Sequence, residues 1–140
     1  MSFTVNSTAF SDGGILPDAQ VKALGNTSPQ LSWSGAPEGT RSFAVTCYDP
    51  DAPTGSGFWH WTVANIPADV AELAAGAGAV GGANLPKGAV QGRTDYGEAG
   101  FGGAAPPPGH GPHRYIFTVF AVDVDRLDVT EDNSGAVFGF

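Results

Sequence analysis

Glycine and proline divide this chain into short apolar segments, and this division limits the possible folds more than any other feature. Of the 140 residues, 21 are glycine and 11 are proline, whereas 6 are lysine or arginine and 14 are aspartate or glutamate. Coiled coils and helical bundles need long, charged, amphipathic helices, so this composition excludes them. A chain of this length buries roughly two thirds of the surface that it exposes when unfolded. We therefore expect one domain over residues 1–140, with no need of a structural disulfide or metal.

Three segments are typical of β-strands. Residues 41–48 alternate between two faces, and residues 58–65 are aromatic and β-branched. Residues 114–122 are apolar on both faces, which predicts a central strand covered on both sides. Weaker strands are expected at residues 3–6 and 31–33.

One short helix is expected over residues 67–75, with Asp69 and Glu72 near its start and Gly76 at its end. Because helix is so scarce, the strand segments favour an antiparallel β-sandwich or barrel. Our prediction of the fold class is mainly β: an antiparallel Greek-key β-sandwich with one short helix and long loops rich in glycine and proline.

Residues 76–112 contain 12 glycines and 5 prolines. Taken alone, this composition is typical of a flexible linker. The strong strands on both sides favour instead an ordered loop that forms part of a site. Residues 76–81 also match the spacing G-x-G-x-x-G, but the expected helix precedes these glycines instead of following them, which excludes a dinucleotide site.

The charge of the chain excludes several classes of partner. The formal net charge is -8 and the six cations are scattered, so we expect neither nucleic acid nor an anionic membrane surface as a partner. No segment approaches the length of a membrane span, and we expect no signal peptide, which predicts a cytoplasmic protein. Cys47 is the only cysteine, which excludes an internal disulfide, and its apolar surroundings predict a buried side chain.

Two carboxylates follow the first strong strand in the sequence Asp49-Pro50-Asp51-Ala52-Pro53. The two prolines restrict their own backbone and that of the preceding residues, so the carboxylates are held on a stiff turn. An ordinary surface turn, in which the side chains bond local amides, is the alternative interpretation.

Two histidines have similar settings: His60 lies within a strand, and His113 precedes one. Imidazoles and loop amides that converge at strand ends can donate hydrogen bonds to a small anion, while a carboxylate orients an imidazole. A metal site fits less well, because the histidines and carboxylates lack the dense spacing of a zinc motif. We expect no metal and no cofactor.

Four motifs in order resemble one protein family. They are SPQLSW at residues 28–33, DPDAP at 49–53, FWHW at 58–61 and PPGHGPHRY at 107–115. From about residue 3 to residue 140 the chain is similar to the phosphatidylethanolamine-binding protein family, in its bacterial Raf-kinase-inhibitor-like branch. The resemblance implies an antiparallel β-sandwich with a small pocket for phosphate or for the phosphoethanolamine head of a lipid.

The motifs also imply the site residues. The expected anion ligands are Asp49, Asp51, His60, His113 and Tyr115. The expected pocket walls are Pro50, Trp59, Phe101, Gly102 and Pro107. Bacterial relatives continue beyond the position of Phe140 through a helix and a strand, so we expect either a truncated or processed C-terminus or a covering supplied by a partner subunit, such as a homodimer.

Three functions are compatible with these residues. The first is a non-enzymatic binding protein for phosphate or phosphoethanolamine. The second is an interaction module that inhibits a kinase or protease through the glycine-rich loop or the acidic run of residues 123–132, as members of the family are described to do. The third is a weak hydrolase with His60 or His113 as general base; the G-x-S-x-G and P-loop motifs are absent.

Overall fold

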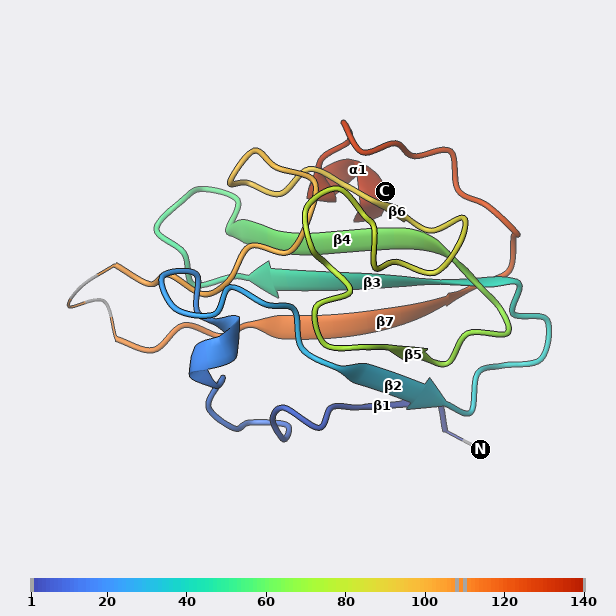
Figure 1. Ribbon diagram of the computed structural model, residues 1–140, viewed down its shortest axis with the longest axis horizontal. Helices are drawn as coiled ribbons and strands as arrows, with labels where there is room; N and C mark the ends of the chain where they lie inside the picture. Colours follow the sequence, from blue (N-terminus) through green and yellow to red (C-terminus); the bar gives the residue numbers. More distant parts are fainter. Residues whose placement is uncertain (1, 108, 110, 140) are drawn as a thin grey trace.

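The chain forms two antiparallel sheets in the computed structural model, which describes residues 2–107, 109 and 111–139 (Figure 1). The larger sheet has the strand order β6-β4-β3-β7 and the smaller one the order β1-β2-β5. The strands are β1 (Thr4–Asn6), β2 (Leu31–Ser34), β3 (Ser42–Asp49), β4 (Phe58–Pro67), β5 (Glu72–Leu73), β6 (Val90–Gln91) and β7 (Ile116–Val122). A 3-10 helix, η1, spans Asp18–Gln20, and one short α-helix, α1, spans Gly135–Gly139. This architecture confirms the mainly β fold class.

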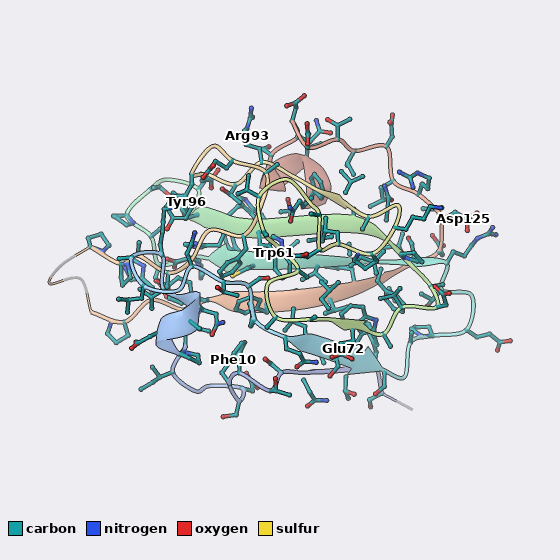
Figure 2. All side chains as sticks on the ribbon, viewed as in Figure 1. Phe10, Trp61, Glu72, Arg93, Tyr96 and Asp125 are labelled. Atoms are coloured by element: carbon teal, nitrogen blue, oxygen red, sulfur yellow. The ribbon has the colours of Figure 1, made fainter. Side chains whose placement is uncertain are left out.

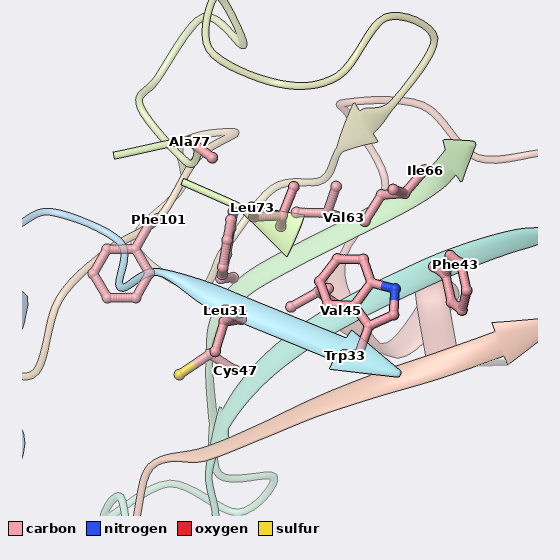
Figure 3. Close-up of a cluster of buried hydrophobic side chains, with 11 residues drawn as sticks. Leu31, Trp33, Phe43, Val45, Cys47, Val63, Ile66, Leu73, Ala77 and Phe101 are labelled. Carbon is pink, nitrogen blue, oxygen red and sulfur yellow. The ribbon is translucent and has the colours of Figure 1, made fainter. Parts of the chain in front are cut away.

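The hydrophobic core lies between the two sheets (Figure 3). Strand β3 alternates as its sequence predicts, and places Phe43, Val45 and Cys47 in this core. Trp33 of β2 faces Phe43 from the smaller sheet, with ring centroids 5.4 Å apart. Burial of each such side chain stabilises the folded state by about 1.5–3 kcal/mol, so this layer holds the two sheets together.

The expectation of a central strand near residues 114–122 is wrong. Strand β7 is at the edge of the larger sheet and, within the described part of the chain, pairs only with β3. Its outward side chains Ile116 and Phe120 are 44% and 46% exposed. The apolar composition of the segment correctly indicated a strand, but the order of strands in a sheet depends on long-range pairing, which local composition does not report.

The expected helix at residues 67–75 is also wrong. Strand β4 continues to Pro67, and after a turn strand β5 pairs with β2, with Leu73 opposite Leu31. Leu73 is fully buried by this pairing. Tertiary burial therefore overrides a weak local preference for helix. The short helix lies instead at Gly135–Gly139, where it packs on the outer face of β4.

The glycine-rich segment after β5 is packed against the core, as an ordered loop requires. Gly78 N–H donates to Ser28 Oγ at 2.8 Å, and Phe101 N–H donates to the Gly78 carbonyl at 2.7 Å. The side chain of Gln91 accepts from Trp61 Nε1 and donates to the Ala79 carbonyl. These bonds tie the loop to the interior of the sandwich.

None of the helices in the described part of the chain has the length and hydrophobicity of a membrane span.

Gly78→Ala tests the packing of this loop. A Cβ at residue 78 would lie 2.8 Å from atoms of both Phe101 and Trp61, so we expect the free energy of unfolding to fall by about 1–3 kcal/mol. Gly55→Ala is the matched control, because a Cβ there meets no atom within 4 Å, and it should change stability by less than about 0.5 kcal/mol. Urea unfolding measures both; equal stabilities of the two variants would contradict the packing.

Candidate functional site

Asp49 is a buried carboxylate at the end of β3 whose two oxygens are both used. Oδ1 accepts the Asp51 N–H at 2.7 Å, which is the local turn contact expected of an ordinary Asp/Pro turn. Oδ2 lies 2.7 Å from His113 Nδ1, and both side chains are only 3% exposed. Because a carboxylate only accepts, His113 Nδ1 carries the proton of this bond. The stiff turn therefore orients a histidine 64 residues away in the chain.

Asp51 and Arg114 form a second connection between the same two segments. Arg114 donates to the Asp51 carboxylate from its backbone N–H at 2.8 Å, from Nε at 3.0 Å and from Nη2 at 2.9 Å. Hydrogen bonds from the Arg114 side chain, followed by the one from its backbone, lower the pKa of Asp51 to about 2. The pair is solvent-exposed, with Arg114 69% and Asp51 30% exposed, so it positions His113 more than it stabilises the fold.

His60 is placed by an irregularity in β4. Cys47 pairs with Trp61 and Tyr48 with Trp59, so His60 is an extra residue in β4, a β-bulge. The bulge brings His60 to the inner side of the sheet, where its ring lies 5.0 Å from that of Phe58. His60 Nδ1 donates to the Gly102 carbonyl at 2.8 Å.

The buried position of His60 favours the neutral form of its imidazole. The residue is 3% exposed, and burial lowers its pKa below the ordinary value of 6.5, although the bond to Gly102 and the charge of Asp49 oppose this shift. His60 is therefore mainly neutral at pH 7 in the unliganded protein.

Tyr115 connects the two histidines. Its ring centroid lies 5.3 Å from that of His60 and 6.4 Å from that of His113. Burial, followed by the charge of Asp49, raises the pKa of Tyr115 to about 12, so the phenol remains protonated. Its hydroxyl is buried and has no hydrogen-bond partner in the described part of the chain. A buried polar group without a partner is costly, and a ligand oxygen would satisfy it.

The five expected ligand residues are thus connected by direct contacts in the structure. Only some of the expected pocket walls contact these residues. Gly102 touches His60, whereas Phe101 packs one layer deeper against Trp61. Trp59 lies on the outer face against Tyr48, with ring centroids 4.5 Å apart, because the bulge separates it from His60.

Neither of the two prolines among the expected walls is fully buried. Pro50 is half-buried within the turn, and Pro107 is exposed. Pro108 and His110 of the same motif lie outside the described residues.

Tyr96 is a site residue that the motifs did not reveal. Its ring lies 5.6 Å from that of His60 and 4.7 Å from that of Phe58. The available indication was an aromatic residue inside a glycine-rich loop, but nothing in the sequence showed that this loop folds back onto β4.

A groove of about 1220 Å³ opens beside the site, between the N-terminal residues 5–16 and the start of β7. His113, Arg114 and Tyr115 line it, whereas Asp49, Asp51 and His60 do not. The described residues contain no group of three or more His, Cys, Asp or Glu side chains that could hold a metal ion. The site offers hydrogen-bond donors, two imidazoles and one buried carboxylate.

The fold and this arrangement define a class of protein. A family model described as phosphatidylethanolamine-binding protein matches residues 6–140, so the chain belongs to that family. A crystal structure of Escherichia coli YbcL, described as a new member of the mammalian PEBP family, superposes with a TM-score of 0.96 at 55% identity, covering 98% of this chain and 87% of that one.

Two relatives of high identity are described as UPF0098 proteins. The chain is 62% identical over 116 residues to the UPF0098 protein YbcL of Escherichia coli K12, covering 83% of this chain and 63% of YbcL. It is 53% identical over 139 residues to YbhB of the same organism, covering 96% of this chain and 87% of YbhB. The chain therefore spans less than two thirds of YbcL.

Substitution of Arg114 tests the electrostatics at the turn. In Arg114→Gln the pKa of Asp51 should rise from about 2 towards 3.8, because the charged hydrogen bonds that favour the carboxylate are lost. Carboxyl chemical shifts followed by NMR against pH measure this. Arg126→Gln is the control, since Arg126 donates to the Gly88 carbonyl and contacts no carboxylate of the site. A pKa of Asp51 that stays near 2 in Arg114→Gln would show that another group is responsible.

Proposed function

We propose that this site binds a phosphate-type anion, either free phosphate or the phosphate of a phosphoethanolamine or phospholipid head group. The observation that carries the proposal is the buried Tyr115 hydroxyl, a donor with no partner in the described part of the chain, on a ring that lies next to both imidazoles. Tyr115 and the imidazoles supply donors of the kind that phosphate oxygens accept. The family model matched by the chain is named for binding phosphatidylethanolamine, which supports the same ligand class.

Each imidazole has one nitrogen assigned to a bond within the protein. His60 Nδ1 is bonded to the Gly102 carbonyl and His113 Nδ1 to Asp49. Recognition of an anion by the His60 ring is therefore through Nε2, which donates when the ring is protonated. A protein of net charge -8 binds an anion by such local donors, because its overall field is repulsive.

Tyr115→Phe separates binding from folding. Because the hydroxyl makes no hydrogen bond with any described residue, its removal should leave stability unchanged or slightly higher, yet weaken inorganic phosphate binding by about tenfold. Tyr48→Phe is the matched control, since its hydroxyl donates to the Ser56 carbonyl at 2.7 Å on the outer face. That variant should lose stability and keep its phosphate affinity. Calorimetric titration and thermal unfolding measure both properties; unchanged phosphate affinity in Tyr115→Phe would count against the proposed site.

The affinity for a strong-acid anion should rise as the pH falls. Anion binding favours imidazolium, and burial keeps the pKa of His60 low, so the rise should continue below 6.5. Sulfate is the suitable probe, because its own charge is constant between about pH 5 and 8, where histidine titrates. Each proton taken up on binding contributes about tenfold per pH unit. His60→Gln should flatten the part of the profile below 6.5, whereas a wild-type affinity that is independent of pH would contradict an imidazolium contact.

We further propose that the chain acts in the cytoplasm as a binding protein and not as an enzyme. The oriented His113–Asp49 pair has the geometry of a general base and its positioning carboxylate, so the distinction needs a measurement. Hydrolysis of p-nitrophenyl phosphate that is lost in His113→Ala would establish an enzyme instead. Inhibition of a kinase or protease, and a homodimer, stay predictions from the sequence.

A further inference from the structure

Tyr96 belongs to the loop between β6 and β7, and it reaches the site by folding back over β4. Figure 2 shows it at the end of the larger sheet where β3 ends and β4 begins. Its ring is edge-on to those of Phe58 and His60, at 4.7 and 5.6 Å. Its hydroxyl donates to the Gly103 carbonyl at 2.7 Å. The residue thus contacts both the imidazole and the backbone that the imidazole bonds.

The peptide unit between Gly102 and Gly103 is held on both sides. Its carbonyl accepts from His60 Nδ1 at 2.8 Å, and its N–H donates to Asn26 Oδ1 at 2.7 Å. Two successive glycines allow many backbone conformations, so contacts with other residues decide where this carbonyl points. Tyr96 supplies two such contacts: its ring packs so closely on Gly102 that a Cβ there would lie 2.2 Å from Cδ2, and its hydroxyl bonds the next carbonyl.

We propose that Tyr96 is a positioning residue that holds the Gly102 carbonyl against His60 and thereby fixes the tautomer of the imidazole. A carbonyl oxygen only accepts, so the nitrogen that faces it, Nδ1, must carry a proton. In the neutral ring this makes Nε2 the acceptor. On the proposed function, on which this consequence rests, His60 then accepts from the P–OH of a singly ionised phosphate or takes up a proton and donates to a phosphate oxygen.

The surroundings of Tyr96 suit this role. The ammonium of Lys22 lies 4.2 Å from the ring centroid, on a residue whose backbone N–H is bonded to the Ala104 carbonyl. This cation–π contact holds the ring from the segment that follows η1. Burial raises the pKa of Tyr96 to about 12, so its hydroxyl remains a donor throughout the histidine range.

Tyr96→Phe tests the inference, because it keeps the ring and removes only the bond to Gly103. We expect the ¹⁵N chemical shifts of His60 Nδ1 and Nε2 to move towards each other as the Nε2–H tautomer becomes populated, and inorganic phosphate affinity to fall by about tenfold. Tyr48→Phe is again the control, since it removes a hydroxyl-to-carbonyl bond of equal length, 2.7 Å, away from His60. It should change neither readout.

Asn26→Gly is a second variant that acts on the same peptide from its other side. It removes Oδ1, and glycine readily keeps the positive φ of residue 26, which is 49° in the wild type. We expect the population of the Nε2–H tautomer of His60 to rise, as in Tyr96→Phe.

The outcomes separate the two proposals. An unchanged His60 tautomer in Tyr96→Phe, whether or not phosphate affinity falls, overturns the positioning role, as does an equal tautomer shift in Tyr48→Phe. Absence of phosphate binding to the wild type overturns the proposed function, while the tautomer measurement still decides the role of Tyr96.

Discussion

The buried hydrogen bond between Asp49 and His113 is the constraint on which the site depends. Asp49 ends β3 and His113 lies just before β7, so the bond fixes how the chain enters the strand that pairs with β3. Both side chains are almost completely buried, and loss of either partner would leave the other without its bond at a cost of about 1–3 kcal/mol. Tyr115 follows two residues later and is thereby brought to His60. The exposed Asp51–Arg114 pair reinforces this placement from the solvent side.

The other half of the site depends on backbone irregularity. The bulge in β4 brings His60 to the inner face next to Trp61, which strict alternation would not allow. The glycine-rich loop then meets His60 with the Gly102 carbonyl, and Tyr96 covers both. One histidine is thus oriented by a carboxylate and the other by a carbonyl. The two rings have different electrostatic surroundings although they flank the same tyrosine.

Much of the fold and most of the candidate site could be predicted from the sequence. Alternation and aromatic content located the strands around residues 41–48 and 58–65, and four motifs pointed to five residues that the structure brings into contact; their role as ligands remains a prediction. The helix at 67–75 was wrong because pairing of Leu73 with Leu31 outweighs local preference. Trp59 lies away from the pocket because a bulge leaves no trace in a hydrophobic pattern, and Tyr96 was missed because its contacts are long-range.

The sequence by itself determined the class of fold, the ordered motifs that place the chain in its family and the chemical identity of the groups at the site. These properties depend on residue type and on short-range order, which the sequence states directly. Only the tertiary structure decided that β7 is an edge strand, that Asp49 orients His113 while the Gly102 carbonyl orients His60, and that the Tyr115 hydroxyl is buried without a partner in the described residues. Each of these features depends on which distant segments of the chain come into contact and on which groups they shield from water. Burial and hydrogen-bond geometry arise only when the chain is packed.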